Sequence, residues 1–142
     1  MIFISNLIGK FFFIGNSPYM PGTVASFFGL LLWMVIPYNL YIRLLIIICT
    51  WLIGHYCIQA IIKNHEEADP PSIVIDEVVG IWISCLFIHD NIVLSCLAFI
   101  LFRYFDIMKP SFLYHAQRLK GSWGIMLDDV LAGFLTSVII IF

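Results

Sequence analysis

Residues 24–62 read VASFFGLLLWMVIPYNLYIRLLIIICTWLIGHYCIQAII, and Arg43 is the only Lys, Arg, Asp or Glu among them. This charge divides the stretch into two uncharged runs, residues 24–42 and 44–62, each of 19 residues. A helix needs about 20 mostly apolar residues to cross the hydrocarbon core of a bilayer. Both runs therefore predict helices that span a membrane.

The whole chain shares this apolar character. Its 142 residues are 62% hydrophobic and only 11% charged, whereas soluble proteins average about 25% charged residues. The length allows one domain over residues 1–142, and the composition predicts that lipid surrounds most of it. A net charge of −2, without a basic run, argues against nucleic acid as a partner. We expect an integral membrane protein.

Helices are the expected elements, because lipid requires every backbone polar group to be satisfied within a helix or a closed barrel. No alternation of apolar and polar residues favours strands. Pro21 and Pro37 bound the first long segment, and the prolines at 70 and 71 block continuation of the second. The prediction is an all-α compact bundle of about four to five membrane helices. The expected segments are residues 21–36, 40–64, 72–88, 92–109 and 124–142.

Charged residues divide unequally between the two ends of such a bundle. If each segment crosses once, Arg43 is the only basic residue at one end, and Asp90 is the only acidic one. Basic residues favour the cytosolic side, so we expect the other end to face the cytosol. A rival topology, with one span over residues 78–102, would bury Asp90 in lipid at a cost of several kcal/mol. The basic residues at the expected cytosolic end are Lys10, Lys63, Arg103, Lys109, Arg118 and Lys120.

Two pairs of carboxylates begin predicted helices at this cytosolic edge. Asp76 and Glu77 lie in IDEVVG, and Asp128 and Asp129 lie in LDDVLAG. Acidic residues in a first turn also complement the helix dipole, which is the structural alternative. Two pairs at one depth, however, repel each other unless a cation lies between them. Oxygen ligands without His or Cys at ligand spacing favour Mg²⁺, so we expect all four carboxylates to be catalytic and metal-binding.

Five further residues are candidates for binding a phosphate. Arg103, Asp106 and Lys109 are spaced three apart and share one helical face. Their two cations suit a phosphate dianion, although interfacial Arg and Lys also extend to the lipid surface without any site. Thr23 and Ser26 begin the first long helix, whose free amides can bind an anion, although Thr23 could also cap the helix.

Four motifs resemble those of a known family. SPYMPGTVAS, SIVIDEVVGIW, FRYFDIMKP and GIMLDDVLAGF occur in family order over residues 11–142, and the chain resembles the phosphatidylglycerophosphatase A family. The resemblance implies Mg²⁺-dependent hydrolysis of phosphatidylglycerophosphate to phosphatidylglycerol and phosphate, on the cytosolic side of the bacterial inner membrane. It points to the carboxylates and cations named above. The segment LKGSWG before residue 125 is less glycine-rich than the family pattern.

The resulting hypothesis is a lipid phosphatase. Mg²⁺, held by some of the four carboxylates, would bind the terminal phosphate while Arg103 and Lys109 neutralise its remaining charge. A metal-activated water would attack phosphorus, although the sequence also permits a carboxylate nucleophile. The alternative is a cation- or proton-coupled transporter, since carboxylates in a membrane often line ion paths. A scaffold whose acidic edge docks a partner is a third possibility.

Overall fold

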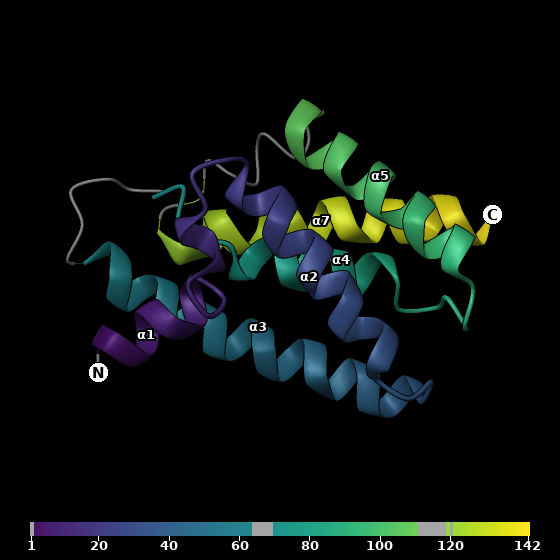
Figure 1. Ribbon diagram of the computed structural model, residues 1–142, viewed down its shortest axis with the longest axis horizontal. Helices are drawn as coiled ribbons and strands as arrows, with labels where there is room; N and C mark the ends of the chain where they lie inside the picture. The colour runs from purple at the N-terminus through teal and green to yellow at the C-terminus, as the bar shows by residue number, and fades with distance from the viewer. Residues whose placement is uncertain (1, 64–69, 111–118, 120) are drawn as a thin grey trace.

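The computed structural model of the chain describes residues 2–63, 70–110, 119 and 121–142. Every regular element among these residues is helical (Figure 1), so the all-α prediction is confirmed for the described part of the chain. The elements are α1 (Ile2–Gly9), the 3₁₀ turn η1 (Ile14–Asn16), α2 (Pro21–Val35), α3 (Leu40–Ile62), α4 (Ile75–Ser84), α5 (Ile92–Met108) and α7 (Ser122–Ile141).

Four of the five expected long helices match α2, α3, α5 and α7 to within two residues at each end, although residue 64 lies outside the described residues. The third expectation is wrong. We expected a helix over residues 72–88, but α4 has only 10 residues. At about 1.5 Å per residue it is roughly 15 Å long, half the thickness of a hydrocarbon core. A helix this short cannot cross a bilayer alone and must be sheltered by protein.

Contacts from other helices satisfy backbone groups on both sides of α4. Before it, the Val74 amide donates to the Gly9 carbonyl of α1 at 3.0 Å. After it, the indole Nε1 of Trp33 donates to the Cys85 carbonyl at 3.2 Å. Backbone groups outside the helix are therefore hydrogen-bonded within the protein, and α4 can end without leaving them unsatisfied.

Arg43 satisfies further backbone groups at this end of the molecule. Its guanidinium is buried, donating from Nη1 to the Ile88 carbonyl at 2.9 Å and from Nη2 to the Ile36 carbonyl at 3.3 Å. The group also lies 5.0 Å from the Trp33 ring centre and 4.8 Å from that of Tyr38, within the range of cation–π attraction. The only charge in residues 24–62 therefore joins the segments that follow α2 and α4.

Residues 78–102 do not form one continuous helix, because a turn separates α4 from α5. The chain leaves α4 at Ser84, and Asp90 takes a left-handed conformation with φ of 38°. Asn91 then caps α5 by accepting a hydrogen bond from the Leu94 amide at 3.1 Å. Asp90 thus lies in a turn with an exposed side chain, as the preferred topology predicted.

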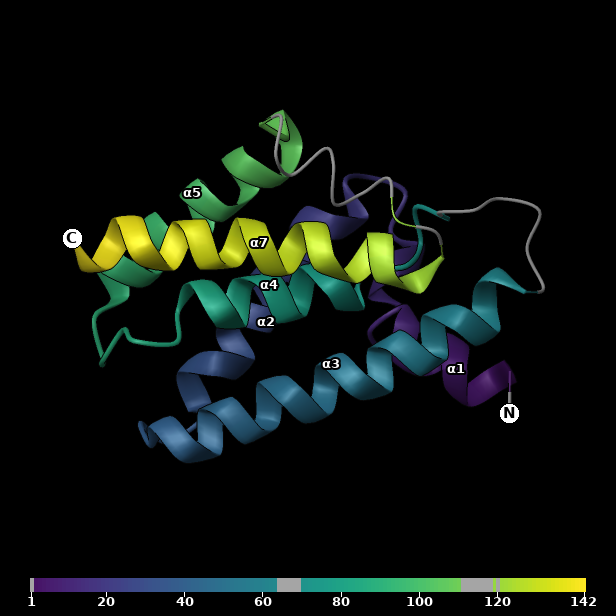
Figure 2. The same ribbon diagram turned by 180° about the vertical axis from the view of Figure 1, so that it is seen from behind.

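Helix packing centres on α4. In both ribbon views α7 lies along α4, and α1 lies beside α3 (Figures 1 and 2). The helix α2 packs across α4, and α5 packs on α7. Successive long helices alternate in direction along the molecule (Figure 1). This alternation places the starts of α2, α4 and α7 toward the same end.

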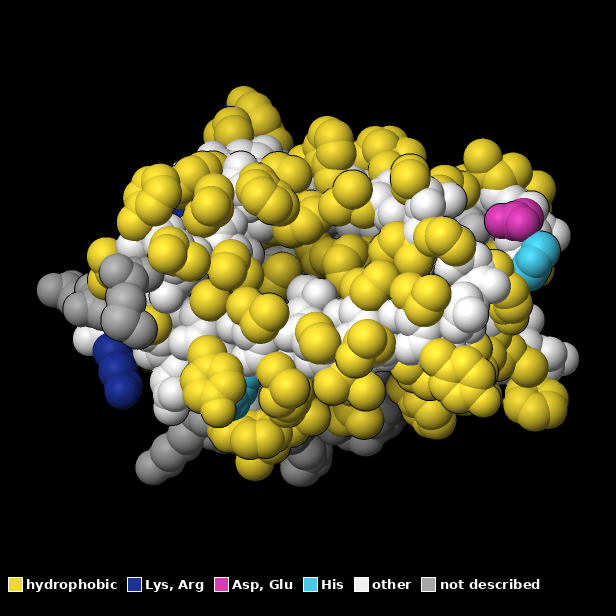
Figure 3. All heavy atoms as spheres, turned by 90° about the horizontal axis from the view of Figure 1, so that it is seen from below, with side chains coloured by type: hydrophobic (Ala, Val, Ile, Leu, Met, Phe, Trp, Pro, Cys, Tyr) yellow, Lys and Arg dark blue, Asp and Glu magenta, His cyan; other side chains and the backbone are white. Residues whose placement is uncertain are grey.

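The surface is largely hydrophobic. In the view of Figure 3, hydrophobic side chains cover most of the face, and the acidic and basic side chains that show lie toward its two ends. Within the described residues, α3 and α7 are long and apolar enough to cross a membrane, and α2 is a shorter apolar helix. The number of crossings stays a prediction. Arg118 and Lys120, two of the basic residues used to orient the bundle, lie outside the described residues.

Candidate active site

A pocket of about 480 Å³ lies where α2, α4 and α7 begin and α5 ends. Eight of the nine residues expected to form the site line it, so residues far apart in the sequence converge as predicted. Ser26 is the exception, since its buried hydroxyl donates to the Gly22 carbonyl of its own helix at 2.8 Å. The eight pocket residues are Thr23, Asp76, Glu77, Arg103, Asp106, Lys109, Asp128 and Asp129.

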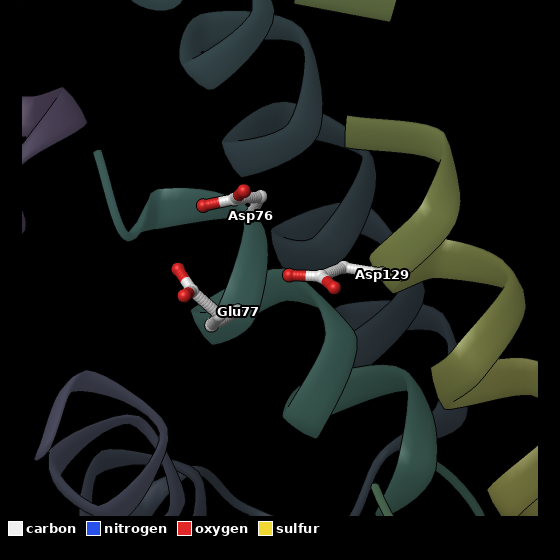
Figure 4. Close-up of side chains that lie close together, drawn as sticks. All are labelled: Asp76, Glu77 and Asp129. Atoms are coloured by element: carbon white, nitrogen blue, oxygen red, sulfur yellow. The ribbon is translucent and has the colours of Figure 1, made fainter. Parts of the chain in front are cut away.

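Three carboxylates form a cluster inside the pocket. Asp76 and Glu77 extend from α4 and Asp129 extends from α7, and their carboxylates gather around one space (Figure 4). One oxygen of each lies within 4.8 Å of the others. Asp76 and Asp129 are 8% and 3% exposed, so water screens their mutual repulsion poorly. We call Asp76, Glu77 and Asp129 the carboxylate cluster.

Two glycines allow α4 and α7 to approach closely enough to form this cluster. A Cβ added at Gly133 of α7 would collide with the carbonyl oxygen of Gly80 on α4. A Cβ at Gly80 would lie 2.5 Å from the Phe102 ring and 3.0 Å from the Asp129 carbonyl oxygen. Neither position has room for a larger residue without moving a helix, so these glycines fix the distance between the two acidic motifs.

The carboxylate cluster fits a hard divalent cation. Its ligand atoms are all carboxylate oxygens, the type that Mg²⁺ prefers. Glu77 Oε2 is buried and has no hydrogen-bond partner among the described residues, and a buried oxygen of this kind calls for a partner. A cation between the three groups would supply that partner and offset their repulsion.

Asp128 lies in the same pocket but has a different neighbour. The Lys109 ammonium donates to Asp128 Oδ2 at 2.7 Å, so this carboxylate forms an ion pair instead of joining the carboxylate cluster. Lys109 lies just beyond the last residue of α5. Burial disfavours its charged form, but the hydrogen bond and charge of Asp128 outweigh that effect and raise the pKa of Lys109. Lys109 therefore stays cationic in the pocket.

Arg103 provides the second cation. Its Nη1 lies 2.6 Å from Asp106 Oδ2, one helical turn along α5, and both side chains are mostly buried. The Arg103 Nε atom is buried and has no hydrogen-bond partner in the described part of the chain. The pocket thus holds two cations next to three clustered carboxylates, an arrangement with room for both a metal ion and an anion.

The start of α2 forms the wall of the pocket next to Glu77 and Arg103. A Cβ at Gly22 would collide with the Glu77 carboxylate and lie 3.3 Å from Arg103 Nη1, so a larger residue here would displace the end of the Glu77 side chain. Thr23 Oγ1 is buried without a hydrogen-bond partner among the described residues. A helix start of this kind presents amide groups to an anion.

Apolar residues complete the wall, and the sequence analysis missed them. Ile73, Ile107 and Ile125 line the pocket together with Met20 before α2. Ile107 could have been found, because it lies four residues after Arg103 and so on the same helical face. Ile73 and Met20 precede helices, and no periodicity places them.

Comparison with known proteins gives a consistent picture. The family model for phosphatidylglycerophosphatase A matches residues 7–142. A phosphatidylglycerophosphatase A of Escherichia coli is 32% identical over 96% of this chain and 81% of its own length. That of Haemophilus influenzae is 36% identical over 86% of this chain and 77% of its own length. No solved structure matches the chain.

A third relative bears a different name. A Bacteroides thetaiotaomicron protein, provisionally named as a phosphatidylinositol-3-phosphatase, is 35% identical over 97% of this chain and 92% of its own length. All three names describe phosphatases. The family match extends over nearly the whole chain, including every helix that lines the pocket. The chain therefore belongs to the phosphatidylglycerophosphatase A family and is a phosphoric monoester hydrolase.

Proposed function

We propose that the pocket hydrolyses phosphatidylglycerophosphate to phosphatidylglycerol and inorganic phosphate. The observation that supports this most strongly is the carboxylate cluster lying beside Arg103 and Lys109 in one pocket. Guanidinium and ammonium groups suit the phosphate dianion, and carboxylates suit a divalent cation. Two of the relatives are named for this activity.

The proposed cofactor is Mg²⁺, held by Asp76, Glu77 and Asp129. When bound, Mg²⁺ supplies positive charge where negative charge develops on the phosphoryl oxygens. Asp128 was also an expected ligand, but its ion pair with Lys109 favours a separate role. The protein groups around the cluster then determine how the phosphate is oriented.

Several groups of the chain can bind and orient the phosphate. Arg103 and Lys109 neutralise its charge, and the Thr23 hydroxyl donates to one of its oxygens. Asp106 holds the Arg103 guanidinium through their ion pair at 2.6 Å. Binding of this kind aligns phosphorus with an attacking water, which accounts for most of what a protein contributes to phosphoryl transfer.

Asp128 is our candidate for the proton acceptor. Its Oδ2 accepts from Lys109, while Oδ1 is buried and has no hydrogen-bond partner among the described residues. In the proposed step, the water oxygen bonds to phosphorus and the bond from phosphorus to the glycerol oxygen breaks. Asp128 takes a proton from the water, and the leaving alcohol is protonated from solvent.

The proposed location is the bacterial cytoplasmic membrane, with several crossings and the pocket at the cytosolic side. The apolar helices α3 and α7 support the membrane assignment. Lys10 and Lys63 lie just after α1 and α3, whereas Arg43 near the other end is buried and bonded to backbone carbonyls. Basic residues at the pocket end favour a cytosolic orientation.

The transporter alternative has no observation in its favour. Buried hydroxyls beyond the pocket donate to carbonyl groups of the residue four positions earlier, as Ser84 does to Gly80 and Thr136 does to Ala132. The hydrogens of these hydroxyls are therefore already bonded to the helix backbone. We therefore do not propose transport.

Phosphate release from defined lipids tests the proposed function. The purified protein in detergent micelles would receive phosphatidylglycerophosphate with Mg²⁺, with a chelator, and with the chelator followed by excess Mg²⁺. We expect release that the chelator abolishes and Mg²⁺ restores. Phosphatidylinositol 3-phosphate belongs in the panel because of the Bacteroides relative's name. Faster release from that lipid would overturn the proposed substrate, and chelator-resistant release would overturn the metal site.

A further inference from the structure

Three apolar residues line the charged pocket and are also exposed: Pro71, which precedes α4, and the two residues Met20 and Ile107. Met20, immediately before α2, is 63% exposed, and Ile107, in the last turns of α5, is 60% exposed. Residues that line a pocket and are mostly exposed stand at its mouth. The mouth of this charged pocket is therefore partly apolar, and apolar surface is stable in contact with lipid and unfavourable in contact with water.

The mouth lies between α2 and α5. Farther along the two helices, Gly22 lies against the Arg103 side chain, and the rings of Phe27 and Phe99 pack at 6.4 Å between centres. The Phe27–Phe99 contact joins α2 to α5 beyond the pocket, whereas Gly22 and Arg103 line the pocket itself. Ile107 follows Arg103 by one turn and so lies farther from this ring contact, toward the end of α5. Figures 1 and 2 show the same end of α5 diverging from α7.

The surroundings of the mouth suit the boundary between lipid and water. Tyr19, beside Met20, is 82% exposed, and Tyr104 on α5 is 55% exposed. Tyrosine is enriched at membrane–water interfaces because its ring is apolar and its hydroxyl is polar. An opening at this level gives a lipid access to the pocket without taking its acyl chains out of the bilayer.

We propose that the mouth between Met20 and Ile107 is a lateral portal for a phosphomonoester lipid. The phosphate would enter the charged pocket, while the acyl chains would pass over these two side chains into the surrounding bilayer. This inference rests on the proposed function and adds a substrate-binding surface to it. A lipid is the occupant that fits, because one cavity presents both kinds of surface. Its cations suit the phosphate, and the apolar side chains at its mouth suit the acyl chains.

Substitution of one rim residue by tryptophan tests the portal. Ile107→Trp would narrow the mouth. Met108→Trp is the matched control, because Met108 is the next residue of α5, is 63% exposed and does not line the pocket. The measurement is kcat/KM with Mg²⁺ for two substrates, a diacyl lipid phosphomonoester in micelles and its deacylated headgroup phosphate. If the deacylated compound turns over too slowly, its Ki as a competitive inhibitor replaces kcat/KM.

The portal predicts a loss confined to the diacyl substrate. We expect Ile107→Trp to lower kcat/KM about tenfold or more for the diacyl lipid and to leave the deacylated phosphate within about twofold. Met108→Trp should leave both unchanged, and Met20→Trp should behave like Ile107→Trp. Equal losses in the Ile107 and Met108 variants would overturn the portal, as would an equal loss on the deacylated phosphate. Wild-type protein that releases phosphate from neither substrate would instead overturn the proposed function.

Discussion

The charged side chains of the pocket form two kinds of contact. Asp128 and Asp106 each have a cationic partner, at 2.7 Å and 2.6 Å. The three carboxylates of the cluster lie within 4.8 Å of one another, and mutual repulsion at that distance is large in a buried site. We interpret the paired carboxylates as positioning and proton-accepting groups, and the cluster as the metal site.

Asp129 is the cluster residue whose loss should be most damaging to activity, because it is the only member from α7. Asp129→Asn keeps the size of the side chain but removes its charge. We expect a loss in kcat of at least about 100-fold, as when a group that stabilises the transition state is removed. Phosphate release from micellar substrate would measure it. The control is Asp90→Asn, in the exposed turn at the other end, which should keep full activity; an active Asp129→Asn protein would disprove the site assignment.

Lys109 should contribute to substrate binding and to the placement of Asp128. Lys109→Ala removes a cation from the phosphate site and leaves a buried carboxylate without its partner. We expect kcat/KM to fall by about tenfold to 100-fold, equivalent to roughly 1.4–3 kcal/mol, which is typical of a charged hydrogen bond. Lys109→Arg should recover part of this loss because it restores the charge. If the alanine and arginine variants have equal kcat/KM values, the charge of Lys109 is not what matters.

Residue types and spacing predicted most of the residues that line the pocket. They did not predict which carboxylates form ion pairs and which form the carboxylate cluster. Neighbouring residues of a helix point about 100° apart, so Asp128 and Asp129 face different partners, and the sequence does not show which. Asp76 and Glu77 are also neighbours, yet both reach the cluster. Ser26 was predicted to bind substrate from its position at a helix start. Its hydroxyl is instead used by the helix backbone, a common alternative for serine.

Among the helices, the close contact of α4 with α7 should be the most sensitive to substitution. Gly133→Ala would place a Cβ against the Gly80 carbonyl and force the two helices apart. We expect a loss of stability of about 1–3 kcal/mol, as is typical of overpacking, and a lower kcat because Asp129 moves with α7.

Thermal unfolding in detergent and phosphate release would measure the two effects of Gly133→Ala. Phe134→Ala, one residue along α7 and 62% exposed, is the control and should change neither quantity. Wild-type stability and activity in Gly133→Ala would show that the spacing between α4 and α7 does not position the carboxylates.

The position of a helix could be predicted where it depends on apolar runs and capping residues that lie close together in the sequence. The starts of α2 and α3 follow from Pro21 and from Asn39, whose side chain accepts from the amides of Tyr41 and Ile42. The length of α4 was not predictable. The residue after its last turn, Cys85, accepts a hydrogen bond from Trp33, 52 residues away, and no window of sequence contains that contact.

For the whole molecule, the proposed orientation can be tested by finding which end of the bundle faces the cytosol. The described helices alternate in direction, so Tyr19 near the pocket and Asp90 in the opposite turn should face different compartments. In a background without Cys49, Cys57, Cys85 and Cys96, Tyr19→Cys and Asp90→Cys would be labelled with an impermeant maleimide in vesicles of known orientation. We expect Cys at position 19 to react from the cytosolic side and at position 90 from the other. Reaction of both from one side would contradict the topology.

The alternating direction of the helices could be predicted, because it depends on the charge and hydropathy of whole segments, which the sequence shows. Charge and hydropathy assign the acidic motifs and most basic residues to one end, and the structure places eight of the nine expected residues in one pocket. The lateral mouth could not be predicted in this way. It depends on how the end of α5 lies relative to α2 and α7, which results from side-chain packing between helices.

We propose that Asp76, Glu77 and Asp129 bind the divalent cation required for phosphomonoester hydrolysis. The most direct test is the dependence of phosphate release on Mg²⁺ concentration, measured for wild-type protein and for Asp76→Asn, Glu77→Gln, Asp129→Asn and the control Asp90→Asn. We predict that wild type and Asp90→Asn reach saturation at the same Mg²⁺ concentration, while the three cluster variants need at least about tenfold more or show no release. Identical Mg²⁺ curves for all five proteins would show that these three carboxylates do not bind the required cation.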